Sequence, residues 1–158
     1  MTSDILSARN LLLIQIVATA MMTGIIWFVQ IVHYPLFLKI PSEGFVSYEQ
    51  SHTIRTGFVV APLMLLELGT AILLLLLTVT SAGRLTIGLS PLYLGALGCL
   101  LVIWASTFLV QVPLHGLLEQ HADSKAMTLL VSTNWIRTIF WSLRLGLLAL
   151  LVAGQMMP

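Results

Sequence analysis

The feature that most limits how this chain can fold is a set of four apolar segments, each long enough to cross a lipid bilayer. A hydrocarbon core about 30 Å thick needs about 20 apolar residues for one helical crossing. Hydrophobic residues make up 58% of the 158 residues and charged residues only 8%, against about 25% charged in soluble domains. The sequence therefore predicts an all-α integral membrane four-helix bundle. Its crossings are expected at about 10–34, 57–80, 91–113 and 125–156.

Composition also excludes several classes of function. The formal charge of +1 provides no basic surface for nucleic acid, and the lone cysteine, Cys99, excludes an intramolecular disulfide. The apolar segment after Arg9 has no evident cleavage point, so we expect a retained first span, and a chain that starts near Met1, rather than a signal peptide. We expect one membrane domain over residues 1–158, with the lipid bilayer as its partner. A homo-oligomer or a larger membrane complex is compatible with this composition.

Two short echoes in the sequence indicate that a two-helix hairpin was duplicated. His52-Thr-Ile-Arg-Thr56 resembles Asn134-Trp-Ile-Arg-Thr138, 82 residues later, and His33-Tyr-Pro-Leu36 resembles Gln111-Val-Pro-Leu114, 78 residues later. Since both hairpins would have the same orientation, a pseudo-two-fold axis along the membrane normal should relate them. Chance similarity between apolar helices is the alternative. The predicted hairpins cover residues 10–80 and 91–156.

Two polar connections should lie at one membrane face. Pro35 removes a backbone donor and disfavours helix just before it, so the first crossing is expected to stop or kink there. Pro41-Ser42-Glu43 is typical of a helix start, which predicts a short surface helix within 39–55 that runs into the second crossing. The other connection is expected at 114–124, whereas 81–90 should form a loop at the opposite face.

Polar side chains are concentrated where the first and third crossings end and the second and fourth begin. In an antiparallel bundle these points share one face. Each helix also has one polar and aromatic stripe at helical spacing, and lipid cannot satisfy polar groups, so the stripes should point inward and meet. The residues expected to converge are His33, His52, His115, Gln30, Gln111, Asn134 and Arg137.

Basic residues do not decide the orientation in the membrane. Outside the helices, Arg9 and Arg84 lie at one face and Lys39 and Lys125 at the other, so the positive-inside rule gives a tie. The histidine-bearing face also has several acidic residues. We therefore expect this face to lie outside the cytoplasm, in a bacterial inner membrane.

Three histidines expected on three different helices predict a metal site. Glu49 and His52 form Glu-x-x-His, a spacing that puts both side chains on one helix face and is used by metal proteins built as helix bundles. With His33 and His115 at similar depth, the donor set suits iron, copper or zinc, and Glu49 or Glu119 would complete it. We expect the three histidines to be metal ligands and Glu49 to be a ligand or proton acceptor.

Other interpretations of these residues stay open. The histidines can form a structural cluster that is hydrogen-bonded to neighbouring amides, which would suit a non-catalytic accessory or ligand-binding subunit. They can also ligate haem. Glu67 and Arg144 lie within the hydrocarbon layer, where a charge needs a partner, so we expect a direct or water-bridged pair. Such a pair would also suit a small transporter.

Residues beside the histidines suggest a site for a hydrophobic small molecule. Arg137 and Asn134, about two turns into the fourth crossing, are expected to position a substrate with an acidic group. Two tryptophans share the helix faces of two glutamines and could wall a flat apolar ligand, although tryptophans at this depth also form interfacial belts. The residues expected around a cofactor or ligand are Trp27, Trp104, Gln30 and Gln111.

The segments Trp27-Phe-Val-Gln-Ile-Val-His33-Tyr-Pro and Asn134-Trp-Ile-Arg137 resemble those of small four-helix bacterial membrane proteins around the anthrone-oxygenase-like domain. The resemblance covers most of the chain and concerns the hairpin plan, the aromatic end of the first helix and the asparagine. A looser similarity is to small membrane-bound haem-dependent protoporphyrinogen oxidases, whose accompanying basic residue is not evident here, so haem is the second choice of cofactor. Both resemblances imply oxidation of a flat aromatic or tetrapyrrole substrate by a metal- or haem-dependent membrane oxidoreductase.

Overall fold

The structure is a computed structural model that describes residues 2–80 and 87–156. Within this part, four helical stretches are long and apolar enough to cross a membrane. The predicted all-α four-helix bundle is therefore confirmed, and the chain has the architecture of a multi-pass integral membrane protein. The stretches are Ala8–Phe37, Ser42–Thr80, Pro91–Leu118 and Ser124–Gly154.

The first and third stretches are each built from three successive helical elements, whereas the second and fourth are single helices. The elements of the first stretch are α1 (Thr2–Phe28), the π-helix η1 (Val29–His33) and α2 (Tyr34–Phe37). The second stretch is α3 (Ser42–Thr80), and a single 3₁₀ turn, η2 (Ile87–Leu89), follows it. The third consists of α4 (Pro91–Ser106), the π-helix η3 (Thr107–Gln111) and α5 (Val112–Leu118), and the fourth is α6 (Ser124–Met156).

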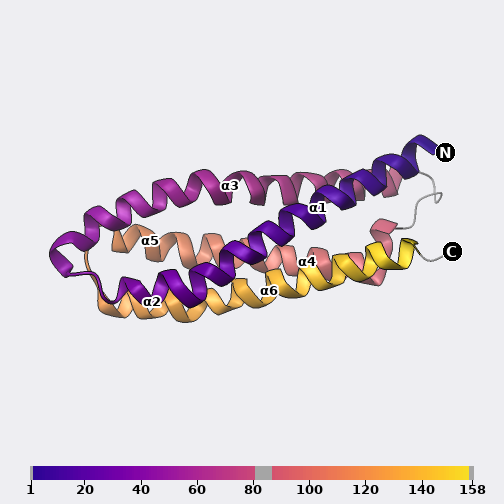
Figure 1. The fold of residues 1–158 in the computed structure, drawn as a ribbon. Coiled ribbons are helices and arrows are strands. Elements are labelled where there is room, and N and C mark those ends of the chain that lie inside the picture. Colours follow the sequence, from indigo (N-terminus) through magenta and orange to yellow (C-terminus); the bar gives the residue numbers. More distant parts are fainter. Residues whose placement is uncertain (1, 81–86, 157–158) are drawn as a thin grey trace.

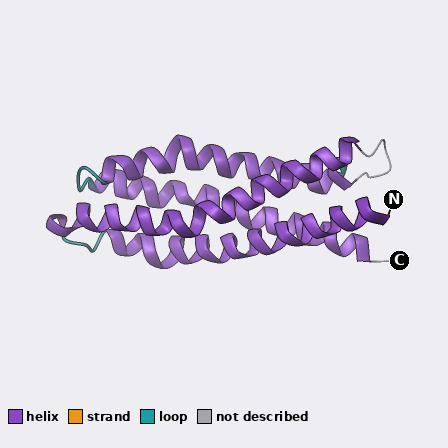
Figure 2. Cartoon of the chain, turned by 90° about the horizontal axis from the view of Figure 1, so that it is seen from above, coloured by secondary structure: helices purple, strands orange, loops and turns teal. Residues whose placement is uncertain are grey.

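The four stretches run lengthwise beside one another, and both ends of the chain lie at the same end of the bundle (Figure 1). The connections after α2 and after α5 lie together at the opposite end, as both views show (Figures 1 and 2). The antiparallel arrangement therefore places the two predicted polar connections at the same end of the bundle. Arg84 and the rest of 81–86, predicted as loop, lie outside the described residues.

Cysteine labelling can test this topology in a membrane. Ser42 and Ser124 are exposed at the starts of α3 and α6, so single cysteines there should react with an impermeant maleimide from the same side. A cysteine at the exposed Arg9 should react only from the other side. The parent would be Cys99→Ala, which removes the one native thiol. Labelling of the Ser42 and Ser124 positions from opposite sides would contradict the bundle.

Pro35 does not end the first helical stretch, so of the two predicted outcomes, a stop or a kink, the stop is excluded. The chain widens into the π-turn η1, where the Tyr34 N–H bonds to the Val29 carbonyl, and then continues as α2. Pro113 follows η3 in the same way, after a Val112 N–H bond to Thr107. A proline removes one bond from the α-helical ladder, and a π-turn is a recognised way for a helix to absorb such a break.

The two π-helices also support the predicted repeat. η1 begins at Val29 and η3 at Thr107, 78 residues later, which is the spacing of the His33 and Gln111 echo. Both hairpins therefore have the same irregularity at matching positions. The pseudo-two-fold axis itself stays a prediction.

The expected surface helix is not a separate element. It forms the first turns of α3, which is continuous over 39 residues from Ser42 to Thr80 with Pro62 inside it. Gly57 costs a helix only about 1 kcal/mol relative to alanine, too little to interrupt one that packs along α1. The connection before α6 is also shorter than predicted, at 119–123, because α5 continues past Pro113.

Three hydrophobic clusters follow one another along the inside of the bundle. Tyr93 and Leu148 belong to the cluster near the termini, Trp141 to the middle one, and Tyr34 and Phe45 to the one near the connections. The outer surface is apolar as well, with many exposed leucine, isoleucine, valine and phenylalanine side chains. An apolar interior combined with an apolar exterior is what lipid as solvent requires.

Candidate functional site

The histidines predicted to converge do meet, at the end of the bundle opposite the termini. His33 is the last residue of η1, His52 lies in α3 and His115 in α5, so each comes from a different helical stretch. Glu49 precedes His52 by one turn of α3 and is fully buried. The Glu-x-x-His spacing therefore presents both side chains to the same interior region.

Glu49, His52 and His115 form a group whose possible ligand atoms all lie within 4.8 Å of one another. We refer to these three residues as the Glu-His-His group. Glu49 Oε1 accepts from or pairs with His115 Nδ1, whereas the buried Glu49 Oε2 has no hydrogen-bond partner among the described residues. Two ligands of a tetrahedral metal with bonds of about 2.0 Å are about 3.3 Å apart. Small side-chain movements would therefore let this group hold an ion, which would also satisfy Oε2.

His33 lies behind His52 and is not part of this group in the described structure. Its Nε2 is 3.0 Å from His52 Nδ1, and Thr56 Oγ1 is 3.1 Å from the same nitrogen. These contacts occupy one side of the His52 ring and leave Nε2 for a ligand. Hydrogen bonds of this kind orient metal-binding imidazoles, so the geometry fits His33 as an outer partner better than as the ligand that we predicted.

Tyr34 is a site residue to which the sequence analysis assigned no role. It is buried, and its hydroxyl lies 3.1 Å from His115 Nε2. Together with the Glu49 contact on Nδ1, this forms a carboxylate, imidazole and phenol chain. An imidazole that is bonded on both nitrogens can move a proton between its two partners. The signal in the sequence was the position of Tyr34 directly after His33, on the polar stripe.

An aromatic shell surrounds the histidines. Phe37 is fully buried, and its ring centroid lies 4.8 Å from that of His33 and 5.2 Å from that of His52, edge to face. Tyr48 is parallel to His52, with an interplanar angle of 2°. Phe37 therefore shields one side of the His33 and His52 rings from water, which strengthens electrostatic interactions there, whereas Tyr48 is itself exposed.

A cavity of about 530 Å³ lies directly beside the Glu-His-His group and is walled by all four helical stretches. We call it the lateral cavity. Its volume falls within the range of about 300 to 1,000 Å³ usual for small-molecule sites. Most of its wall is apolar, with Met22 of α1 and Met64 of α3 among the lining residues. The polar side chains that line it and matter most below are His52, His115, Tyr34, Gln111, Trp104 and Arg137.

The lateral cavity reaches the outer surface of the bundle. Leu65 of α3, Phe108 of η3 and Val112 of α5 all line it, yet they are 60%, 54% and 50% exposed. Side chains that line a cavity and are also exposed mark its rim. Because this rim is apolar and lies between α3 and the third stretch, the opening faces the lipid.

Arg137 and Asn134 lie where the sequence placed them, inside the bundle and next to each other. The Arg137 Nε and Nη2 donate to Asn134 Oδ1 at 2.9 and 2.6 Å, and Asn134 Nδ2 donates to Gln30 Oε1 at 2.8 Å. Gln30 Nε2 in turn donates to the Val131 carbonyl. The predicted glutamine therefore fixes the asparagine and does not line the lateral cavity, whereas Arg137 does.

The two tryptophans predicted to wall a ligand lie in different environments. Trp104 lines the lateral cavity. Trp27 is 42% exposed, donates to Ser142 and packs edge to face on Trp135, so its placement in a cavity is corrected. The π-turn after Trp27 changes the angular spacing along the helix, so the stripe expected for a regular α-helix does not continue straight.

Glu119 and His121 are not part of the Glu-His-His group, although Glu119 also lines the lateral cavity. Glu119, the alternative carboxylate, accepts from Thr53 Oγ1, and its backbone carbonyl accepts from Gln50. These bonds attach the connection after α5 to α3. His121 is exposed in the same connection, so it serves below as a control.

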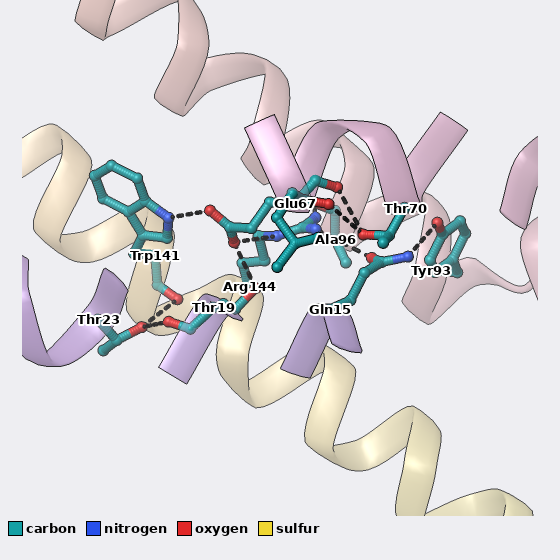
Figure 3. Close-up of polar contacts among 10 residues, drawn as sticks. Gln15, Thr19, Thr23, Glu67, Thr70, Tyr93, Ala96, Trp141 and Arg144 are labelled. Carbon is teal, nitrogen blue, oxygen red and sulfur yellow. Dashed lines mark hydrogen bonds and ion pairs between the residues drawn. The ribbon is translucent and has the colours of Figure 1, made fainter. Parts of the chain in front are cut away.

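A second buried polar cluster confirms the predicted pair of Glu67 and Arg144 (Figure 3). Both side chains are fully buried, and Arg144 Nε lies 3.3 Å from Glu67 Oε1. Thr19 donates to the same carboxylate oxygen, and Trp141 Nε1 donates to the other at 3.0 Å. Both carboxylate oxygens therefore have partners.

The guanidinium of Arg144 is equally well satisfied. Besides Glu67, it donates from Nη1 to the Ala96 carbonyl at 2.6 Å and from Nη2 to Gln15 Oε1 at 3.1 Å (Figure 3). Gln15 continues the network to the Tyr93 hydroxyl. This cluster joins α1, α3, α4 and α6 and has the complete hydrogen bonding expected of a structural element. The structure gives no support to the transporter interpretation of this pair.

Comparison of the chain with protein families, with curated proteins and with solved structures gave no match. The function is therefore argued from the site alone.

Proposed function

We propose that the protein is an oxygenase-like membrane oxidoreductase that uses a transition metal, held by Glu49, His52 and His115, on a hydrophobic substrate. The observation that carries this proposal is the position of the Glu-His-His group at the wall of the lateral cavity, which His52 and His115 both line. A substrate in the cavity would lie against the bound ion. Imidazole and carboxylate donors suit iron, copper and zinc, of which iron and copper supply electron transfer when bound.

The surrounding residues have definite parts in this proposal. His33 and Thr56 hold the His52 ring, and Tyr34 holds the His115 ring. Because Tyr34 also lines the cavity, it can donate a proton to a bound molecule or accept one. Arg137, fixed by Asn134, would orient the substrate. The resemblance to the anthrone-oxygenase-like group and a place in a bacterial inner membrane, with the histidines outside the cytoplasm, belong to the same proposal.

Metal analysis of protein purified without a histidine tag tests the proposal. We expect a near-stoichiometric content of iron, copper or zinc, of which iron or copper would support the redox part of the proposal and zinc only the metal site. A chelator should lower the melting temperature by about 5 to 10 °C, since a ligand at about 100 times its dissociation constant stabilises by about 2.7 kcal/mol. Adding back the metal should restore the melting temperature.

The proposal would be contradicted by protein that is purified without metal and whose melting temperature changes neither with chelator nor with added metal. The protein would then be better described as a non-catalytic accessory or ligand-binding subunit. One observation favours this second candidate: His33 with His52, and Tyr34 with His115 and Glu49, already hydrogen-bond to one another. The lateral cavity would remain as the binding site.

A further inference from the structure

We infer that the lateral cavity binds an amphipathic anion, whose carboxylate or phosphate head group pairs with Arg137 and whose apolar body extends towards the lipid. This deepens the proposed function, because it rests on the same cavity and names the class of ligand. It does not require the metal. Four observations support it.

The first observation is that Arg137 is a buried cation without a counter-ion. Its side chain is 8% exposed and lines the lateral cavity. Within the described parts of the chain, no carboxylate lies within ion-pair distance of its guanidinium, which instead bonds to the neutral amide of Asn134. Burying an uncompensated charge is costly, both in a protein interior and in a bilayer. The described residues therefore give Arg137 no anionic partner, and an anionic ligand in the cavity would supply one.

The second observation is a comparison within the same helix. Arg144 lies about two turns further along α6 and is also buried, but it has Glu67, Gln15 and the Ala96 carbonyl around it. The fold thus supplies a complete set of partners to the arginine that faces the core. The arginine that faces the cavity has only neutral partners among the described residues, the amide of Asn134 and the hydroxyl of Tyr34. This difference points to a ligand and not to a general tolerance of unpaired charge.

The third observation is that Arg137 is held in one orientation. Gln30 bonds to Asn134, and Asn134 accepts two bonds from one edge of the guanidinium. The Trp141 ring lies 6.0 Å from the guanidinium carbon. A planar guanidinium with a fixed edge presents its remaining donors to carboxylate or phosphate oxygens in a fork.

The fourth observation concerns the remaining surface of the cavity. Trp104 Nε1 and Gln111 Oε1 are buried without hydrogen-bond partners in the described structure, and both residues line the cavity. Buried polar atoms are rarely left unpaired, so these atoms are available to a polar group near the head. The rest of the wall is mostly apolar up to the rim at Leu65, Phe108 and Val112. Its one acidic side chain, Glu119, accepts a hydrogen bond from Thr53. An amphipathic molecule could therefore enter sideways from the bilayer.

Binding of a fluorescent fatty acid tests the inference. Metal-depleted protein carrying Trp27→Phe and Trp135→Phe, which remove the two exposed tryptophans, is titrated with cis-parinaric acid in nanodiscs of neutral lipid. Energy transfer from Trp104 and Trp141, which line the cavity, then reports its occupancy. We expect the acid to bind at least about tenfold more tightly than its methyl ester, as for hydrogen bonds to a charged group. Arg137→Gln should abolish this difference, and Arg137→Lys should keep part of it. Arg55→Gln is the matched control, because Arg55 is exposed and outside the cavity.

Displacement identifies the head group. Palmitate, hexadecyl phosphate and neutral hexadecanol share one chain and differ only at the head. Displacement of the probe by palmitate or by hexadecyl phosphate, with hexadecanol at least about tenfold weaker, supports an anionic ligand. The stronger of the two anionic competitors shows whether the head group is a carboxylate or a phosphate. Equal binding of acid and ester to the native protein would overturn the inference, as would equal displacement by hexadecanol or a preference that survives in Arg137→Gln. Because no metal is present, these results do not depend on the test of the metal site.

Discussion

Replacing Glu67 by glutamine is expected to lower the free energy of unfolding by about 3 to 5 kcal/mol, because Arg144 would remain buried without a counter-ion. Both side chains are fully inaccessible, and the carboxylate is the one charged partner of Arg144 among the described residues. Glutamine keeps the size of the side chain, so the loss would come from the charge and not from a cavity. Unfolding by titration with sodium dodecyl sulfate, followed by circular dichroism, measures the effect.

A double variant separates pairing from packing. Combining Glu67→Gln with Arg144→Gln removes both charges, so part of the lost stability should return, and the double-mutant cycle should give a coupling of about 0.5 to 3 kcal/mol. Arg55→Gln changes an exposed arginine and should leave stability within about 0.5 kcal/mol. Unchanged stability in both single variants would show that the pair does not support the fold.

The distribution of hydrophobicity allowed this pair and the bundle itself to be predicted. A charge in an apolar segment must find a partner, and Glu67 and Arg144 were the two charges at compatible depth. The ends of the helices were harder to predict from the sequence. Pro35 was interpreted as a stop or a kink, and the third crossing was expected to end at Pro113, because a local rule for proline assumes a regular α-helical ladder. A π-turn preserves the helix, and its formation depends on the surrounding packing, which a single sequence does not reveal.

The candidate site was predictable in position but not in detail. Helix spacing brought Glu49 and His52 to one face, and antiparallel crossing brought His115 to the same depth. Which ring nitrogen faces which neighbour depends on side-chain rotation. That rotation sets the contact of His33 with His52 and the contact of the Tyr34 hydroxyl with His115. The exposure of Trp27 has a similar origin, since a π-turn lies between it and the site.

Replacing each of the four histidines by alanine should therefore lower the metal affinity to different degrees. The affinity is measured by titrating the metal-depleted, tag-free protein with metal against a competing chelator. His52→Ala and His115→Ala each remove a proposed ligand, so binding should be lost. His33→Ala removes only a partner of His52, and the loss of such an outer contact lowers affinity by about 10- to 100-fold. Thr56 still reaches the same nitrogen, so we expect the smaller value.

His121→Ala is the matched control, because this histidine is exposed outside the site, and its affinity should not change. Circular dichroism and the metal-free melting temperature would show that each variant folds. Adding Thr56→Val to His33→Ala should deepen the loss towards about 100-fold, since no partner would then hold His52 Nδ1. Equal loss in His33→Ala and His52→Ala would instead make His33 a ligand, as the sequence alone predicts. Unchanged affinity in all of these variants would show that the cluster is held together by its own hydrogen bonds and not by a metal.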